Sequence, residues 1–267
     1  MTRAMSLVCG LCLAGCCSRP HRPATNNAGA GVERIYSRQH ARFPQAVLFK
    51  PAEPANPDLL FKLAPLIILQ VSDTNLPAQL SDGLINPKPP GNPVVKAWAD
   101  SVQLRGQIHP RVNYVWDHPA PHPAAAGVQA QQGVRITLGT NGQPIIWEIL
   151  ADSSGRDLLV VAESLEQGAA RQFGPPLPGR RFAIETATNN YPNFVVARAI
   201  DDGPVAMGPI IYLEQGTRDI ATVICRCMPA QADSLAGSIA YDLRSLPAPT
   251  AQWPVTPLEK RLRLPYF

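Results

Sequence analysis

The sequence predicts an α+β fold in which a mainly antiparallel, strand-rich sheet carries at least one short covering helix. Short apolar runs recur between clusters of turn-forming residues, and the 267 residues include 29 prolines and 19 glycines. The clearest hairpin and the best-capped helix both fall between residues 133 and 174. With 45% apolar residues, the chain is long enough to bury the core of one large domain or two small ones.

The hairpin is expected at 133–150, where Asn141-Gly142 separates two apolar runs. A type I′ turn needs positive φ at both central residues, and Asn and Gly adopt this conformation most readily. With this pair at the turn, apolar residues face apolar residues and Arg135 lies opposite Glu148, as cross-strand energetics favour. The other expected pairs are Val134–Ile149, Ile136–Trp147, Leu138–Ile145 and Thr137–Ile146.

A second hairpin is expected from 94–104 and 108–116, around Arg105-Gly106-Gln107. Because Pro110 lacks an N–H, the strand at 108–116 is expected to pair with only one neighbouring strand at the end that holds Pro110. Residues 158–162 are apolar on both faces and predict a central strand. The remaining strands are expected at 46–50, 65–71, 181–185, 194–200, 209–214, 217–228 and 238–243.

One helix is expected to begin at Ser164. Ser164 is its predicted N-cap, and Gln167, three residues further on, completes a capping box. Leu165, Ala169 and Phe173 recur at helical spacing and predict a stripe that is buried against the sheet. Gly-Pro-Pro at 174–176 is expected to end the helix.

The first sixteen residues have the pattern of a processed leader. One positive charge, Arg3, precedes an apolar run at 4–13 that is too short to span a bilayer. The next residues complete Leu13-Ala14-Gly15-Cys16, which resembles the lipobox of bacterial lipoproteins and matches it at every position. The resemblance implies cleavage before Cys16, a diacylglycerol on its sulfur and a fatty acyl group on the new amino terminus. An ordinary leader with a coincidental cysteine is the alternative.

The resemblance also implies a location in the cell envelope, anchored to a membrane by lipid on its periplasmic or extracellular face. In this family an Asp after the lipidated Cys favours retention in the inner membrane, and Cys17 stands there instead, which favours the outer membrane. We therefore expect a signal peptide at 1–15, the lipidated Cys16 with a flexible tether at 16–45, a globular α+β domain at 46–245 and a Pro-rich tail at 246–267. The tail either packs its aromatic residues on the domain or hangs free.

Cys225 and Cys227 are candidate metal ligands. Residues two apart in a strand point to the same side, so both sulfurs would share one face. Two soft ligands near Met207 or Met228 would suit Cu(I) or Zn²⁺, although they supply only half of a typical four-ligand site. The alternative is that both cysteines are small core side chains. A disulfide between them would be geometrically poor.

Other titratable residues gather without a catalytic pattern. His118 and His122 have the spacing of two ligands on one helical face, but the prolines between them exclude that helix, and His109 is expected in a hairpin. The carboxylates of the central stretch are Glu148, Asp152, Glu163 and Glu166. Their expected roles are structural, because one faces an arginine across the hairpin and two stand at a helix N-terminus.

The function classes are narrowed mainly by what the sequence lacks. It has no serine-hydrolase, zinc-protease, phosphate-loop or dinucleotide motif, and no cofactor is expected. Its net charge is +4, and the basic residues are scattered apart from Arg180-Arg181 and 260–263, which argues against nucleic acid as a partner.

The sequence therefore predicts a lipid-anchored envelope lipoprotein with a non-catalytic binding or structural domain. Its partner would be another envelope protein or cell-wall material. The alternatives are an envelope hydrolase acting on cell-wall or carbohydrate material, and metal handling through Cys225 and Cys227.

Overall fold

The computed structural model describes residues 27–41, 43, 45–71, 92–117, 131–187, 193–214, 216–225 and 238–247. Its helices are α1 (Asn27–Arg38), α2 (Leu59–Lys62), α4 (Glu163–Phe173) and the short 3₁₀ helix η1 (Ala183–Ala187). Its strands are β1 (Ala46–Pro51), β2 (Leu66–Gln70), β3 (Val94–Leu104), β4 (Gln107–Asp117), β5 (Gln131–Leu138), β6 (Pro144–Leu150), β7 (Asp157–Ala162), β8 (Phe194–Ile200), β9 (Pro209–Leu213), β10 (Ile220–Cys225) and β11 (Ser238–Ser245).

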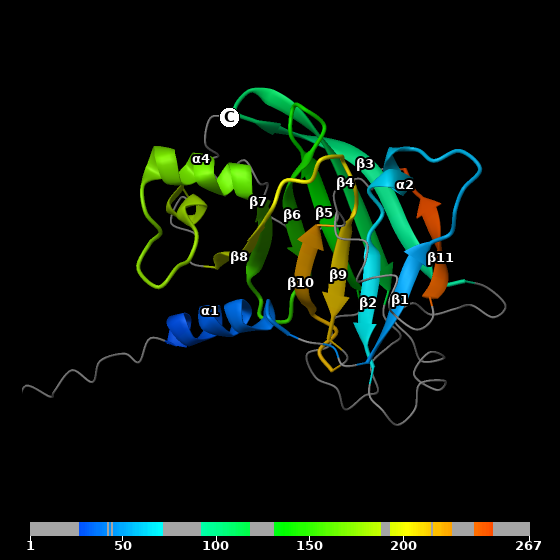
Figure 1. Ribbon diagram of the computed structural model, residues 1–267, viewed down its shortest axis with the longest axis horizontal. Coiled ribbons are helices and arrows are strands. Elements are labelled where there is room, and N and C mark those ends of the chain that lie inside the picture. Colours follow the sequence, from blue (N-terminus) through cyan, green and yellow to red (C-terminus); the bar gives the residue numbers. More distant parts are fainter. Residues whose placement is uncertain are drawn as a thin grey trace, which may run out of the picture.

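Within these residues the strands form one eleven-stranded sheet, in the order β10-β9-β2-β1-β11-β3-β4-β5-β6-β7-β8. The sheet curls until its edge strands β8 and β10 come close together, so that it is nearly a closed barrel (Figure 1). Among the described residues no ladder joins these two edges. Arg198 Nη1 of β8 instead donates to the Thr222 hydroxyl of β10 at 3.0 Å.

The prediction of a strand-rich sheet with a covering helix is confirmed, but the sheet is mixed. β1 and β3 both run parallel to β11, β2 runs parallel to β9, and β7 runs parallel to β8. Each of these pairs joins segments separated by other elements. Hairpin signals describe only neighbours in the sequence, so they reveal antiparallel pairs and miss parallel ones.

The register of the β5–β6 hairpin is confirmed for four of the five expected pairs. The fifth is wrong, because a register shift after Thr137 pairs Leu138 with Pro144 instead of Ile145. The turn type is also wrong, since only Gly142 has positive φ. Gly142 N–H donates to Gly139 O at 3.0 Å and Gly139 N–H donates to Gln143 O at 2.8 Å, so the loop is wider than a two-residue turn.

The two-residue turn occurs in the β3–β4 hairpin instead. Leu104 pairs with Gln107, and both residues between them, Arg105 and Gly106, have positive φ. This is the backbone of a type I′ turn. Pro110 pairs with β3 alone, because the ladder between β4 and β5 starts one residue later, which confirms the one-sided pairing expected there.

The other expected strands are confirmed except at 181–185, where η1 forms, and at 217–228, of which only Ile220–Cys225 is strand as β10. Residues 226–228 lie outside the described residues. The Glu166 carboxylate accepts the backbone N–H groups of Ala183 and Ile184, at 2.5 and 3.1 Å. A side chain from another element therefore satisfies the first donors of this short helix, a partner that no local pattern reveals.

Helix α4 is confirmed with a different N-terminus. Its N-cap is Ala162, which makes no side-chain cap bond, and the Ser164 hydroxyl donates to Asp202 at 2.7 Å. The predicted capping box is therefore wrong, because a carboxylate from the β8–β9 connection takes its place. The expected stripe is buried at Leu165 and Ala169, its third member packs against the core, and Gly174 with φ 85° ends the helix.

The expected tether at 16–45 is wrong for the part that forms α1. Val32, Ile35 and Tyr36 recur at helical spacing, and all three are buried in the main core. α1 therefore belongs to the folded domain (Figure 1). Residues 16–26, which include Cys16, lie outside the described residues. Within the described part of the chain, none of the helices has the length and hydropathy needed to cross a membrane.

The connections lie at two opposite ends of the barrel (Figure 1). We call one the α1 end, which holds α1 with the β6–β7 and β9–β10 turns. We call the other the hairpin end, which holds α2, the β3–β4 turn and the β8–β9 connection. The inner faces of the strands supply most of the main core, and α4 covers β7 and β8 from outside.

Candidate binding surface at the hairpin end

The predicted cysteine sites fall mostly outside the described residues. Cys16 and Cys227 lie there, while Cys225 ends β10 with its backbone opposite Pro209. Within the described residues, no group of three or more His, Cys, Asp or Glu side chains is placed to hold a metal ion. Lipidation at Cys16 and metal binding through Cys225 and Cys227 thus stay predictions.

The histidines are not brought together by the described part of the fold. His109 lies in β4, as the hairpin interpretation expected, and is buried. One of its ring nitrogens, Nδ1, lies 2.9 Å from Leu138 O. His118 and His122 lie outside the described residues.

The four carboxylates of the central stretch are spread over the fold, and three of them join separate elements. Glu148 is buried and pairs with Arg135 at 3.5 Å, as the sequence predicts. Asp152 binds α1, Glu163 accepts a bond from Gln167 at 3.4 Å, and Glu166 accepts the two η1 donors. Their positions give them structural roles.

A buried carboxyl that the sequence does not single out is Glu185 of η1. Its side chain is 2% exposed and lies 3.5 Å from Arg180, while one of its oxygens accepts the Val196 N–H. Burial raises the pKa of Glu185 to about 7, although the Val196 N–H and the Arg180 charge lower it. The segment was expected to be a strand, so nothing in the sequence marked this residue.

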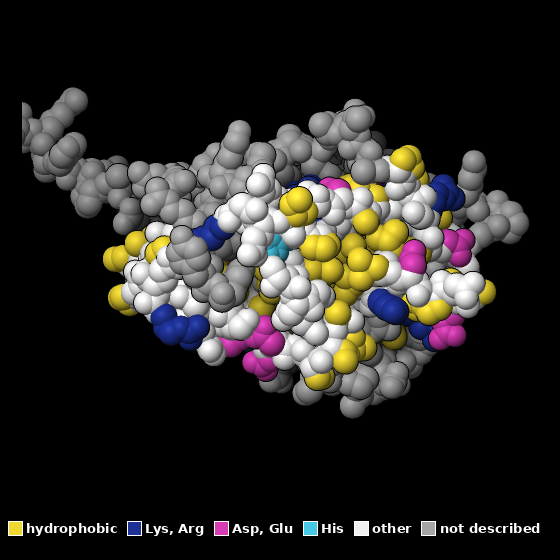
Figure 2. Space-filling view, turned by 90° about the horizontal axis from the view of Figure 1, so that it is seen from above, with side chains coloured by type: hydrophobic (Ala, Val, Ile, Leu, Met, Phe, Trp, Pro, Cys, Tyr) yellow, Lys and Arg dark blue, Asp and Glu magenta, His cyan; other side chains and the backbone are white. Residues whose placement is uncertain are grey.

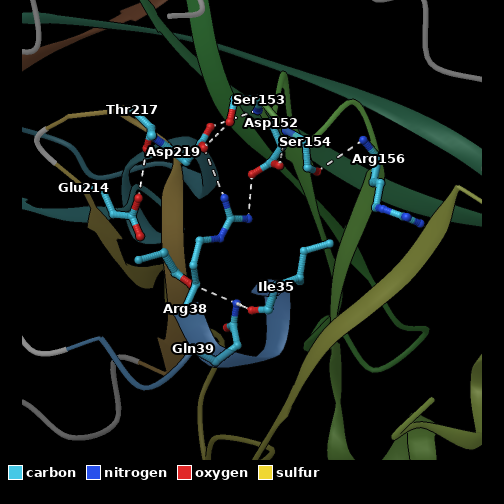
Figure 3. A network of polar contacts seen from close by, with 11 residues as sticks. Ile35, Arg38, Gln39, Asp152, Ser153, Ser154, Arg156, Glu214, Thr217 and Asp219 are labelled. Carbon is cyan, nitrogen blue, oxygen red and sulfur yellow. Dashed lines mark hydrogen bonds and ion pairs between the residues drawn. The ribbon is translucent and has the colours of Figure 1, made fainter. Parts of the chain in front are cut away.

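At the α1 end, Arg38 joins α1 to two turns of the barrel (Figure 3). Its guanidinium lies 2.7 Å from Asp152 of the β6–β7 turn and 3.1 Å from Asp219 of the β9–β10 turn. Asp219 also accepts the Ser153 N–H at 2.9 Å and the Ser153 hydroxyl. Gln39 Nε2 donates to Ala221 O of β10 at 2.8 Å. These contacts together fasten α1 to the barrel.

The hairpin end leaves three large apolar side chains in contact with solvent. Leu59 of α2 is 43% exposed, Ile108 of the β3–β4 hairpin is 73% exposed and Val205 of the β8–β9 connection is 57% exposed. We call Leu59, Ile108 and Val205 the apolar triad. Figure 2 looks onto this end and shows hydrophobic side chains gathered at the middle of the face, with acidic and basic side chains around them.

A pocket of about 420 Å³ opens beside α2, between the loop after β1 and the end of β11. Leu60, Phe61 and Leu243 supply its apolar wall, while Glu53, Asp58 and Asp242 supply carboxylates. Two of the carboxylates already accept hydrogen bonds. Asp58 caps α2 through the Phe61 N–H at 2.8 Å, and Asp242 accepts from Asn92 at 3.0 Å. The pocket is thus acidic and apolar, and its lining residues Asp58 and Leu60 flank Leu59 of the apolar triad.

The comparisons with known proteins found no relative. No family model, no curated protein and no solved structure matches this chain.

Proposed function

We propose that this chain is a lipid-anchored protein of the cell envelope, and that its barrel binds another envelope component at the hairpin end without catalysis. The binding role rests on the apolar triad, because Leu59, Ile108 and Val205 are all exposed at one end of the molecule. Exposed apolar groups that gather on one face are typical of interaction sites.

The anchoring role rests on the lipobox and on the position of α1. Asn27, the first residue of α1, follows Cys16 by only eleven residues, which span at most about 40 Å when extended. α1 is fixed to the barrel by Arg38. A lipid on Cys16 would therefore hold the α1 end near the membrane and leave the hairpin end directed away from it.

The chemistry of the hairpin end describes the partner that it suits. An interface of ordinary composition has an apolar centre and a polar rim. Here the triad supplies apolar groups, and the pocket beside α2 supplies Glu53, Asp58 and Asp242. A partner with an apolar surface next to a cationic group, in an envelope protein or in peptide-bearing cell-wall material, would complement both features.

The hydrolase alternative would require a carboxyl of raised pKa in an accessible cleft. Among the described residues, the carboxyls with raised pKa are Glu166 and Glu185, and both bind backbone N–H groups near η1 instead of lining the pocket. This arrangement supports binding as the leading function.

Anchoring is tested by fractionating cells that express Cys16→Ser, with Cys17→Ser as the matched control. We expect the Cys16→Ser protein to leave the membrane pellet and the control to stay in it. A Cys16→Ser protein that pellets like the parent would contradict the anchor.

Binding is tested by placing a photo-crosslinking amino acid at Ile108 or Val205 in the full chain in intact cells. Leu177, which is 45% exposed and follows α4, is the control position. We expect the two triad positions to yield the same discrete adduct with an envelope protein or cell-wall fragment, absent from the control. Adducts that are equal at all three positions, or absent from the triad, would refute the binding surface.

A further inference from the structure

The barrel has a seam between its two edge strands, β8 and β10, where no ladder joins them within the described residues. Side chains from helical segments bind backbone groups of both edge strands. On the β8 side, Glu185 of η1 accepts the Val196 N–H. On the β10 side, Gln39, directly after α1, donates to Ala221 O at 2.8 Å. The seam is therefore held by contacts other than strand pairing.

Arg38 of α1 spans this seam at the α1 end (Figure 3). Its guanidinium binds Asp152 of the β6–β7 turn, next to β8 in the sheet order, and Asp219 of the β9–β10 turn, at the opposite edge. Both carboxylates are buried, so without this cation they would repel each other. Arg38 thus stabilises the arrangement in which the two edges lie close together.

A neighbouring residue of α1, Tyr36, binds the segment that leads into η1. The Tyr36 hydroxyl accepts the Arg181 N–H at 3.2 Å, and the Arg181 guanidinium lies 4.3 Å from the centre of the Tyr36 ring. The rings of Tyr36 and Phe182 also meet edge to face, with their centres 6.3 Å apart. Because η1 in turn contacts β8, the helix region is attached to both sides of the seam, through Tyr36 on one side and Gln39 on the other.

The two turns that Arg38 joins contain strained backbone. Ala151 has φ 59° and Arg218 has φ 61°, a left-handed conformation that is unfavourable for residues other than glycine. Each of them directly precedes one of the two aspartates that bind Arg38. Such strain persists only while surrounding contacts hold it in place, so the turns are set to relax when α1 leaves.

We propose that α1 is a strap that keeps the barrel closed, and that the seam between β8 and β10 opens when α1 detaches while the other ladders stay intact. Opening the barrel at the seam separates no paired strands in the described part of the chain, whereas opening it elsewhere breaks a ladder. Local opening follows the route that breaks the fewest backbone hydrogen bonds and apolar contacts. The contacts that cross the seam without α1 include Arg198 to Thr222 at 3.0 Å and the Ser153 N–H to Asp219 at 2.9 Å.

The strap controls access to the interior of the barrel. Val195 of β8 and Val223 of β10 are fully buried in the main core, and an open seam exposes the interior beside them. This inference does not depend on the proposed function, because it concerns α1 and the seam and involves neither Cys16 nor the apolar triad.

Hydrogen exchange followed by mass spectrometry on the purified full chain tests the strap. Gln39→Ala removes the contact with β10, and Tyr36→Phe removes the hydroxyl that binds the β8 side. Ser37→Ala is the matched control, since its exposed hydroxyl bonds to Glu33 O within α1. We expect each of the first two variants to raise exchange several-fold in β8 and in β10 alike, because α1 detaches as a unit.

The ladder between β3 and β4 should exchange at the parent rate in all three variants, and Ser37→Ala should match the parent throughout. A rise confined to the side that the altered residue touches would show a local contact instead of a strap. A rise throughout the barrel, or no rise in β8 and β10, would also overturn the proposal.

A second measurement follows the width of the seam directly. Spin labels are placed at Asn193, exposed before β8, and at Gly216, exposed in the β9–β10 turn, as unnatural amino acids so that the native cysteines stay unlabelled. We expect electron–electron resonance to find a longer second distance in Arg38→Ala, absent from the parent and from Arg34→Ala, with Gln39→Ala in its place should Arg38→Ala not fold. A distance unchanged from the parent would overturn the proposal.

Discussion

The Arg38 guanidinium of α1 lies 2.7 Å from the Asp152 carboxylate of the β6–β7 turn, and the Asp152 side chain is 0% exposed. The same guanidinium binds Asp219, whose side chain is 3% exposed. One cation therefore neutralises two buried carboxylates from two turns. α1 is fastened by charge as well as by its apolar face.

The Arg38→Ala variant should lose substantial stability. It leaves two buried carboxylates without their cation, and breaking such a buried pair typically costs about 3–5 kcal/mol. Urea denaturation measures the free energy of unfolding. Arg34→Ala, at an exposed position of the same helix, is the control and should change it by less than about 0.5 kcal/mol. Equal values for the two variants would show that Arg38 does not fasten α1.

Glu185 should make the protein more stable as the pH falls from about 7 to 4.5. Its pKa is raised from 4.5 to about 7 in the folded protein, so the native state holds a proton that the unfolded chain releases in this range. The contribution is fully present below the unfolded pKa and is lost as the pH rises through 7, and it amounts to at most about 3 kcal/mol.

The Glu185→Gln variant tests this linkage, because its amide does not titrate. We expect its free energy of unfolding, measured from pH 4.5 to 7.5, to fall less steeply with pH than that of the parent. Parallel curves for the two proteins would show that Glu185 keeps its ordinary pKa in the fold.

Gly208 should not tolerate a side chain. A Cβ at this position would lie 2.2 Å from Ala64 O and 2.5 Å from Leu63 O, where the β8–β9 connection passes the end of α2. Gly208→Ala must push two backbone segments apart, and overpacking of this kind costs about 1–3 kcal/mol. Gly216→Ala, where a Cβ meets nothing within 4 Å, is the control. If the midpoint of thermal unfolding shifted equally in both variants, the result would contradict the close approach of Gly208 to the Leu63 and Ala64 carbonyls.

Two variants near the N-terminus of α4 distinguish between the capping box that the sequence predicts and the Ser164–Asp202 contact that the structure shows. Asp202 accepts the Ser164 N–H at 2.9 Å and the Ser164 hydroxyl at 2.7 Å. We expect Asp202→Ala to lower the free energy of unfolding by about 0.5–1.5 kcal/mol and Gln167→Ala to have little effect. If Gln167→Ala lowered the free energy of unfolding more than Asp202→Ala, the result would support the capping box instead.

The apolar triad should contribute little to folding. Ile108 is 73% exposed, whereas Ile136 is fully buried in the core. Ile108→Ala should change the free energy of unfolding by less than about 0.5 kcal/mol, and Ile136→Ala should cost about 2–5 kcal/mol. A large loss for Ile108→Ala would mean that the triad serves stability instead of binding.

Much of the local structure could be predicted because it follows from short-range patterns. The alternation around Arg135 and Glu148 placed these residues opposite each other, and Pro110 marked where one-sided pairing ends. The turn type, by contrast, depended on strand pairing as well as on the residues of the turn. Asn141-Gly142 has the stronger type I′ sequence, yet the type I′ backbone forms at Arg105-Gly106. The tight Leu104–Gln107 pairing of the long β3–β4 ladder imposes it there.

The candidate surface could not be predicted in the same way. Ile108 and Val205 belong to segments almost a hundred residues apart, and their place at one end of the barrel follows from the direction of each strand. Glu185 acquires its raised pKa only when η1 is buried beside β8. Burial is a property of the packed molecule, and no neighbour in the sequence reports it.

The sequence by itself determined most of the strand segments, where α4 lies and how the β5–β6 hairpin begins, because these depend on side-chain alternation and turn residues within a few positions. The tertiary structure alone decided that 27–38 joins the core as α1, that distant strands pair in parallel and that the sheet nearly closes. Those outcomes depend on burying three apolar residues of α1 and on matching strand edges far apart in the chain. Their free energy arises only when all the partners are assembled.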